Sequence, residues 1–92
     1  MPQRTIAVGS SVGLHARPAS LLVAAAGKAV SGGSAASVTI ASGGGEPADA
    51  RSILSVIALG AGHGDEVTLT AEGDQADAVL DELAAIVASE ED

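Results

Sequence analysis

The residues from Gly13 to Ser20, which read GLHARPAS, place a histidine, an arginine and a proline at the start of an alanine-rich stretch. A neutral imidazole is nucleophilic, and a guanidinium group forms paired hydrogen bonds with phosphate oxygens. Pro18 suits the first turn of a helix, where the N–H that it lacks would have no partner. We therefore expect a helix to begin near His15, with an anion site formed by His15, Arg17 and the free N–H groups of that turn.

This arrangement fits covalent catalysis in which His15 accepts a phosphoryl group. The backbone N–H groups of Ala16 and Arg17 would then bind phosphate oxygens, together with the guanidinium group of Arg17. A structural alternative is that His15 caps the helix and that Arg17 is a solvated surface charge. An isolated His-x-Arg pair does not distinguish these interpretations.

The remaining candidate residues give weaker signals. His63 lies between glycines in a predicted loop, and we expect a surface residue there rather than a ligand. The two histidines lack the spacing of a metal site, and the glycine-rich residues 43–46 lack the Lys-Ser/Thr of a phosphate-binding loop. We therefore predict no metal and no cofactor. Residues 89–92, which read SEED, are typical of a solvated acidic chain end.

Strands and helices are predicted from the period of the apolar residues. Apolar and polar residues alternate over residues 4–8, 36–42 and 65–71, which predicts strands, and residues 48–50 are expected to form a short edge strand. Helical spacing occurs from residue 16 to about 30 and again after Gly73. The predicted apolar stripes are Ala19, Leu22, Val23, Ala26 and Val30 in the first helix, and Ala76, Val79, Leu80, Leu83, Ile86 and Val87 in the last.

Residues 52–60 are ambiguous, because their apolar run fits either a buried strand or a short helix. Ser52 is a good N-cap and Gly60 a good terminator, so we predict a short helix. The resulting order is β-α-β-β-α-β-α. Since the strands alternate inward apolar with outward polar residues, we predict an α+β fold with an antiparallel sheet that helices cover on one face.

The composition excludes several classes of protein. The 92 residues predict a single domain, 1–92, and the net charge of −8 argues against nucleic acid and anionic membranes as partners. The absence of cysteine excludes disulfides and thiol chemistry. No apolar run is long enough to span a bilayer, and the first residues lack a signal-peptide pattern. We predict a cytoplasmic monomer.

The motif GLHARPAS resembles the active-site signature of the HPr family, the histidine phosphocarriers of the bacterial phosphoenolpyruvate-dependent sugar phosphotransferase system. The stretch RSILSVIALG, residues 51–60, resembles the regulatory serine segment of that family. The stretch GDEVTLTAEG, residues 64–73, resembles its last strand and is followed by a predicted helix. The resemblance thus covers nearly the whole chain in the right order.

The resemblance implies an open-faced β-sandwich, in which a four-stranded antiparallel sheet is covered on one face by three helices. It also implies that His15 accepts a phosphoryl group on Nδ1 from phospho-enzyme I and passes it to a IIA domain of a sugar permease. Arg17 matches the family's phosphate-stabilising arginine, and Pro18 its proline at the helix start. The chain would then be a phosphoryl carrier without turnover of its own.

Regulation and docking are also implied by the resemblance. Ser52 matches the serine that a dedicated kinase phosphorylates in many relatives, which adds a serine kinase and a transcription regulator as partners. The docking surface is expected on the exposed side of the first two helices, at Ala16, Ser20, Ile53, Leu54 and Ile57. For the three residues of the second helix, core packing is an equally good expectation.

Two other classes of function stay open at this point. One is a regulatory interaction protein in which phosphorylation of Ser52 drives binding to a transcription regulator, although the presence of His15 favours the carrier. The other is a small-ligand-binding domain of ferredoxin-like type, which explains the strand order but not the residues GLHARP. The sequence does not indicate which sugar or permease is served, or whether the chain belongs to the nitrogen-related branch of the system.

Overall fold

The computed structural model describes residues 2–43 and 45–89, so most of the acidic end predicted to be solvated lies outside the described residues. The order of the elements is β-α-β-β-α-β-α, as predicted. The strands are β1 (Gln3–Ala7), β2 (Ser37–Ser42), β3 (Ala48–Asp49) and β4 (Glu66–Glu72). The helices are α1 (Ala16–Ser31), α2 (Ile53–Ala58) and α3 (Ala76–Ala88). Where both ends were predicted, the bounds agree to within two residues, as helix and strand ends commonly do.

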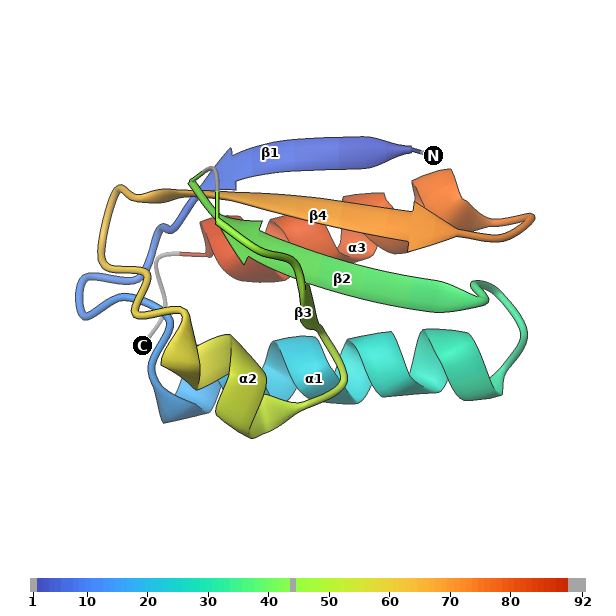
Figure 1. Cartoon of the computed structure of the whole chain (residues 1–92), viewed down its shortest axis with the longest axis horizontal. Coiled ribbons are helices and arrows are strands. Elements are labelled where there is room, and N and C mark those ends of the chain that lie inside the picture. The colour runs from blue at the N-terminus through green and yellow to red at the C-terminus, as the bar shows by residue number, and fades with distance from the viewer. Residues whose placement is uncertain (1, 44, 90–92) are drawn as a thin grey trace.

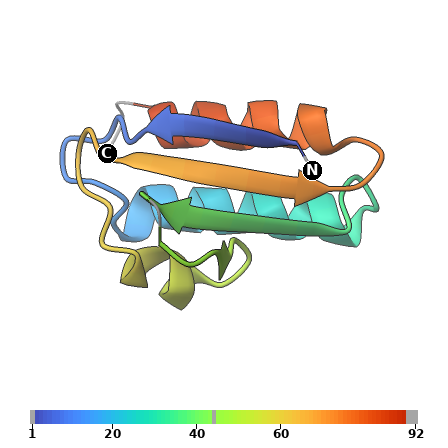
Figure 2. The same cartoon turned by 45° about the horizontal axis from the view of Figure 1, so that its top comes forward.

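The four strands form one sheet in the order β1-β4-β2-β3, and every neighbouring pair is antiparallel. The three helices lie on one side of this sheet (Figures 1 and 2). Helices α1 and α3 run beneath the long strands, whereas α2 packs against α1 and β3. The predicted open-faced arrangement is therefore confirmed.

The alternation in β4 explains why one face of the sheet is covered and the other open. Val67, Leu69 and Ala71 are buried, whereas Thr68 and Thr70 between them are half-buried. Successive side chains of a strand point to opposite faces, so the apolar set faces the helices. On the open face, the hydroxyl oxygens of Thr5 and Thr68 lie 3.2 Å apart across the β1–β4 pair.

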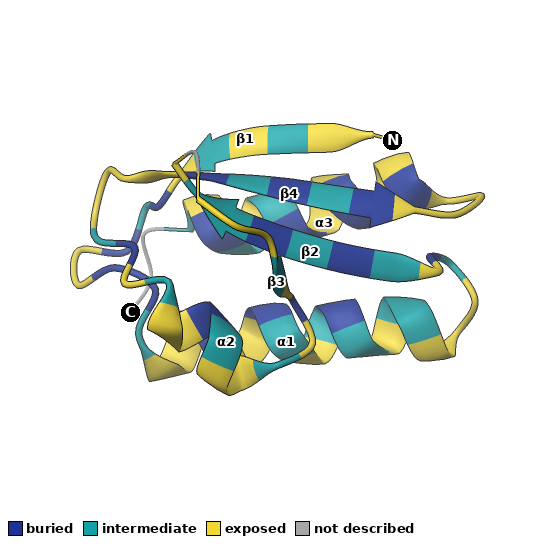
Figure 3. Ribbon diagram, in the orientation of Figure 1, coloured by how far each residue is buried: buried dark blue, intermediate teal, exposed yellow. Residues whose placement is uncertain are grey.

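The core lies between the sheet and the stripes of α1 and α3 (Figure 3). The members of the predicted stripes that are buried are Ala19, Leu22 and Ala26 in α1, and Ala76, Val79, Leu80, Leu83 and Val87 in α3. Val23, Val30 and Ile86 are partly buried and pack at its margin. Within the described residues, no helix has the length and hydropathy needed to cross a bilayer.

The ambiguous segment after residue 51 is helical. Ser52 is the N-cap of α2, and its hydroxyl oxygen accepts a hydrogen bond of 3.3 Å from the N–H of Ser55. Val56 is fully buried against the core, whereas Ile53 and Ile57 are exposed. A short surface helix needs an N-cap and one buried side, and this segment has both. The alternative of a buried strand is therefore wrong.

Candidate functional site

His15 is the N-cap of α1 by its backbone, but its side chain does not cap the helix. The backbone is extended there, with φ −87° and ψ −169°. The N–H of His15 donates to the carbonyl oxygen of Gly13 at 2.9 Å, and its own carbonyl accepts the N–H of Ala19 at 3.0 Å. The imidazole ring is therefore not used for capping, which removes the main structural alternative for this residue.

The two nitrogens of the His15 ring have different surroundings. Nε2 is buried and has no hydrogen-bond partner among the described residues. Nδ1 also has no hydrogen-bond partner among the described residues, but it is not buried. It is therefore the ring nitrogen that solvent reaches. Only one ring nitrogen is thus available to a reactant. For its lone pair to be free, the ring proton must reside on Nε2.

The first turn of α1 supplies two backbone donors beside this ring that have no partner among the described residues. The N–H groups of Ala16 and Arg17 precede the first bond of the helix, which is donated by Ala19. Pro18, between them and Ala19, has no N–H and is buried. Unpaired N–H groups and the positive end of the helix dipole favour an anion at this position.

Arg17 is exposed, and within the described part of the chain its guanidinium group has no ion pair or hydrogen bond. Its carbonyl oxygen accepts a hydrogen bond of 2.8 Å from the hydroxyl of Ser20, one turn along α1. The backbone of the first turn is therefore supported, while the charged group of Arg17 is free to reach a bound anion.

The loop that leads from β1 to His15 is fixed by the loop between α2 and β4. The N–H of Leu14 donates to the carbonyl oxygen of Ala61 at 2.9 Å. Gly13 has φ +81°, and a Cβ atom at this position would lie 2.6 Å from the same oxygen. At the other end of the loop, the N–H of Gly9 donates to the carbonyl oxygen of Val87 in α3 at 3.0 Å. The start of α1 is thus held from two directions.

A group of exposed apolar residues surrounds the start of α1. Leu54 is 78% exposed and Leu21 is 57% exposed, and Ile53 and Ile57 are exposed as well. We call the following set the α1–α2 surface: Ala16, Ser20, Leu21, Ile53, Leu54 and Ile57, all of them exposed. Core packing, the alternative for the three α2 residues, is therefore wrong. Leu21 was not predicted, although it falls outside the buried stripe of α1.

Negative charge is unevenly distributed over the molecule. The chain carries a net charge of −8, yet neither α1 nor α2 contains an acidic residue. The acidic groups of α3 include Asp77 and Asp81, which lie 3.6 and 3.3 Å from the Arg4 guanidinium group. A partner that approaches the α1–α2 surface therefore meets Arg17 without a neighbouring acidic group on either helix.

Ser52 lies in a turn that an ion pair supports. The backbone N–H of Arg51 donates to Oδ1 of Asp49 at 2.9 Å, and its guanidinium group lies 3.3 Å from Oδ2. Hydrogen bonds from Arg51 hold the pKa of the Asp49 carboxyl below its usual value of 3.8. The bond from the backbone N–H has the larger effect, and the bond from the side chain the smaller. Ser52 is half-buried, and its N–H donates to the carbonyl oxygen of Asp49 at 3.1 Å.

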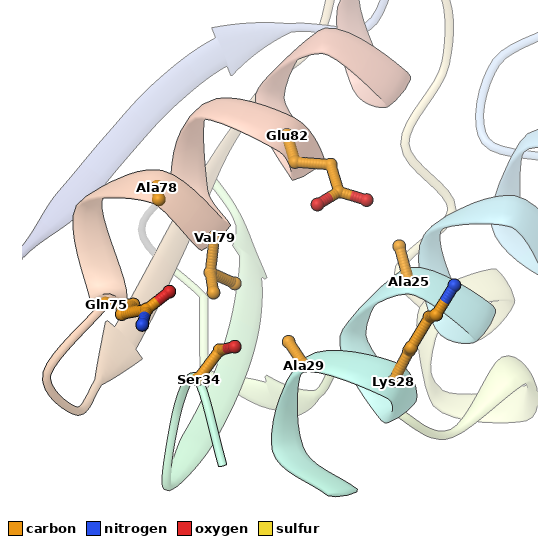
Figure 4. A pocket seen from close by; sticks show the side chains of 8 residues that line it. All are labelled: Ala25, Lys28, Ala29, Ser34, Gln75, Ala78, Val79 and Glu82. Carbon is orange, nitrogen blue, oxygen red and sulfur yellow. The ribbon is translucent and has the colours of Figure 1, made fainter. Parts of the chain in front are cut away.

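A cavity of about 280 Å³ lies between α1 and α3 (Figure 4). Its lining consists of Ala25, Lys28, Ala29, Ser34, Gln75, Ala78, Val79 and Glu82. Lys28 lies about 18 Å along the helix from Ala16, at a rise of about 1.5 Å per residue. No predicted site residue lines this cavity, so it is separate from the His15 site. Among the described residues, no three His, Asp or Glu side chains are grouped as metal ligands.

The chain is similar in sequence and structure to known proteins of one family. The sequence model of the family described as PTS HPr component phosphorylation site matches residues 2–89. The phosphocarrier protein HPr of Streptomyces coelicolor is 43% identical over 88 residues, which cover 96% of this chain and 89% of that protein. The phosphocarrier protein HPr of Haloferax volcanii is 40% identical over 92 residues, covering 97% and 96%. The crystal structure of a phosphocarrier protein HPr from Bacillus anthracis matches with a TM-score of 0.81 and 35% identity, over 94% of this chain and 95% of that one.

Proposed function

The chain belongs to the HPr family of phosphocarriers of the phosphotransferase system, and we propose that it carries the phosphoryl group on Nδ1 of His15. The single observation that carries this assignment is the orientation of the ring, with Nε2 buried and Nδ1 open to solvent beside two free N–H groups. A nucleophile and an anion-binding helix start are thus combined in adjacent residues.

The step is a displacement at phosphorus. The lone pair of Nδ1 forms the new N–P bond, while the bond from phosphorus to the donor breaks and its electron pair stays with the donor. The proton on Nε2 remains in place, so the ring needs no general base. The N–H groups of Ala16 and Arg17 and the guanidinium group of Arg17 bind the phosphoryl oxygens, which bear the negative charge.

The donor is enzyme I, charged by phosphoenolpyruvate, and the acceptor is a IIA domain of a sugar permease. Both must bring an active site to the same nitrogen, so both dock on the surface around it. The α1–α2 surface supports this assignment, because it is apolar and neither helix adds an acidic group. Arg17 lies at the edge of this surface. As transfer proceeds, its guanidinium group can move from the phosphoryl group to a group of the partner.

Ser52 is the site at which a serine kinase would add a regulatory phosphate, and a transcription regulator would bind the modified form. Its position supports both parts of the proposal. The hydroxyl is the N-cap of α2, where a phosphate oxygen still accepts the N–H of Ser55, so the helix is preserved. The added charge lies one residue from Ile53 on the α1–α2 surface and disfavours docking of enzyme I.

The test is to incubate the purified chain with phosphoenolpyruvate and enzyme I, and to measure its intact mass before and after mild acid treatment. One acid-labile phosphate is expected on the wild-type chain and none on His15→Ala. Phosphorus–nitrogen couplings in NMR spectra of the product identify Nδ1 or Nε2 as the bonded atom. A folded wild-type chain that stays unmodified beside an active enzyme I, or a phosphate on Nε2, contradicts the proposal.

A further inference from the structure

A second histidine lies beside the loop that leads to His15. His63 belongs to the loop between α2 and β4, and it is exposed, as predicted for a surface residue. Its Nδ1 atom, however, lies 3.1 Å from the carbonyl oxygen of Ser10, in the loop between β1 and α1. The two loops lie side by side at one end of the molecule (Figures 1 and 2). The contact joins residues far apart in the chain, so no local sequence pattern predicts it.

The carbonyl oxygen of Ser10 links His63 to the backbone of His15. It also accepts the N–H of Gly13 at 3.0 Å, which closes the turn over residues 10–13. The carbonyl oxygen of Gly13 in turn accepts the N–H of His15 at 2.9 Å. A continuous series of hydrogen bonds therefore runs from the His63 ring, through the turn, to the residue whose ring faces solvent at the start of α1.

Three backbone hydrogen bonds also join the two loops. Val8 donates to Asp65 and accepts from Gly64, both at 2.9 Å, and Leu14 donates to Ala61 at 2.9 Å. These bonds hold the two ends of the loop between β1 and α1, whereas His63 contacts its middle. Removing the His63 side chain thus leaves the loops attached and removes one contact of the turn.

We propose that His63 is a positioning residue for phosphoryl transfer at His15, an inference that rests on the function proposed above. Its ring N–H adds a contact to the turn over residues 10–13, and that turn positions the backbone from which the His15 ring projects. A carbonyl oxygen only accepts hydrogen bonds, so Nδ1 of His63 carries a proton and the neutral ring is the Nδ1–H tautomer. Transfer depends on such placement, because the reacting atoms must be aligned before the bond forms.

The tautomer gives a spectroscopic test on the wild-type protein. Long-range proton–nitrogen NMR spectra, recorded at a pH where both histidines are neutral, distinguish a protonated ring nitrogen from an unprotonated one. We expect the protonated signal at Nδ1 for His63. A proton found at Nε2, with Nδ1 unprotonated, overturns the hydrogen bond and with it the proposal.

The kinetic test compares His63→Ala with His63→Asn. The alanine variant lacks the donor, and we expect it to accept the phosphoryl group from phospho-enzyme I about tenfold more slowly than wild type. The asparagine variant retains an N–H donor at the position of Nδ1, and we expect it to recover most of the rate. Thermal unfolding of both variants should stay close to that of the wild type, because the three backbone bonds remain.

The outcomes separate this inference from the assignment of His15. A wild-type rate in His63→Ala overturns the positioning role, and so does an equal loss of rate in both variants, because the hydrogen bond would then not be the cause. A folded wild-type chain that accepts no phosphate at all, beside an active enzyme I, overturns the function of His15 instead. In that case the NMR tautomer still tests the contact between His63 and Ser10.

Discussion

The N–H of Leu14 donates a hydrogen bond of 2.9 Å to the carbonyl oxygen of Ala61, so the residue before His15 is held by a loop from the second half of the chain. Leu14 is also buried, which fixes its side chain in the core. The position of the His15 ring therefore depends on tertiary contacts as well as on the start of α1. This dependence allows the site to be disturbed from residues that never touch a phosphoryl group.

Gly13→Ala tests this contact directly. At φ +81° an alanine is strained, and its Cβ atom would lie 2.6 Å from the oxygen of Ala61, so the two loops must separate. We expect the free energy of unfolding to fall by about 1–3 kcal/mol, with slower phosphorylation of His15. Denaturant unfolding and the enzyme I assay measure the two effects.

Gly27→Ala is the matched control within α1. Nothing lies within 4 Å of a Cβ atom built at this helical position. Alanine is the better helix former, so the same chemical change should raise the free energy of unfolding by up to about 1 kcal/mol. Equal effects of the two substitutions would contradict the role of the loop contact.

Arg17→Ala should slow phosphoryl transfer without changing stability. The guanidinium group has no ion pair or hydrogen bond among the described residues, so no folded-state contact is lost. Loss of a charged donor to the transferring group should reduce the rate by about 100-fold. Arg17→Lys keeps the charge but not the paired donors, and we expect an intermediate rate. Rates equal to the wild type in the alanine variant would rule out this role.

Leu54→Ser should weaken docking and leave the fold intact. The side chain is 78% exposed, so its loss should change the free energy of unfolding by less than about 0.5 kcal/mol. An apolar anchor contributes more to the free energy of binding at an interface. We therefore expect the KM of enzyme I for the chain to rise about tenfold. Steady-state transfer at varied concentrations of the chain measures this change.

Val56→Ala is the control for Leu54, two residues further along α2. This side chain is fully buried, and its truncation should lower the free energy of unfolding by about 2 kcal/mol. The KM of the folded variant should stay near the wild-type value. If instead both variants lose stability and neither changes KM, α2 has no part in docking.

Ser52 allows the cap and the charge to be separated. Ser52→Ala removes the acceptor for the N–H of Ser55 and should reduce the free energy of unfolding by about 1 kcal/mol. Ser52→Asp keeps an acceptor and adds a negative charge beside Ile53, so it should retain stability and accept the phosphoryl group more slowly. A charged variant that reacts as fast as the alanine variant would contradict regulation through this serine.

Local patterns were sufficient to predict much of the fold. Strict alternation in β4 and the i, i+3, i+4 stripe of α3 predicted strand and helix, because each of these elements has one face in the core and the other in water. The segment after Ser52 was harder, since six apolar and small residues fit two structures. Ser52 correctly indicated a helix, because its side chain accepts a hydrogen bond from the backbone N–H of Ser55. In a strand that N–H would bond to a neighbouring strand instead.

The candidate site could be predicted only where the reactive residues and the start of the helix are adjacent in the sequence. His15, Arg17 and Pro18 are neighbours, so their proximity follows from the sequence. The contacts of His63 with Ser10 and the burial of Nε2 depend on how two distant loops pack. The exposure of Leu21 likewise depends on α1 burying only the side that faces the sheet and α3, which a predicted helix alone does not specify.

Asp49→Asn should remove a pH-dependent part of the stability. Because Arg51 lowers the pKa of Asp49 in the folded state below 3.8, the folded chain binds this proton less readily than the unfolded one. The stabilisation is present above pH 3.8 and is lost as the pH falls through the lower, folded-state value. Asparagine keeps the acceptor for the N–H of Arg51 but never carries the charge. The free energy of unfolding of Asp49→Asn should therefore lie below that of the wild type at pH 6. The difference should be small, because the side chains of Asp49 and Arg51 are both 49% exposed. The difference should vanish in strong acid and shrink in high salt. Urea unfolding of both proteins from pH 6 down to pH 2 measures it, and a difference that stays constant over this range would show that the charge of Asp49 does not stabilise the fold.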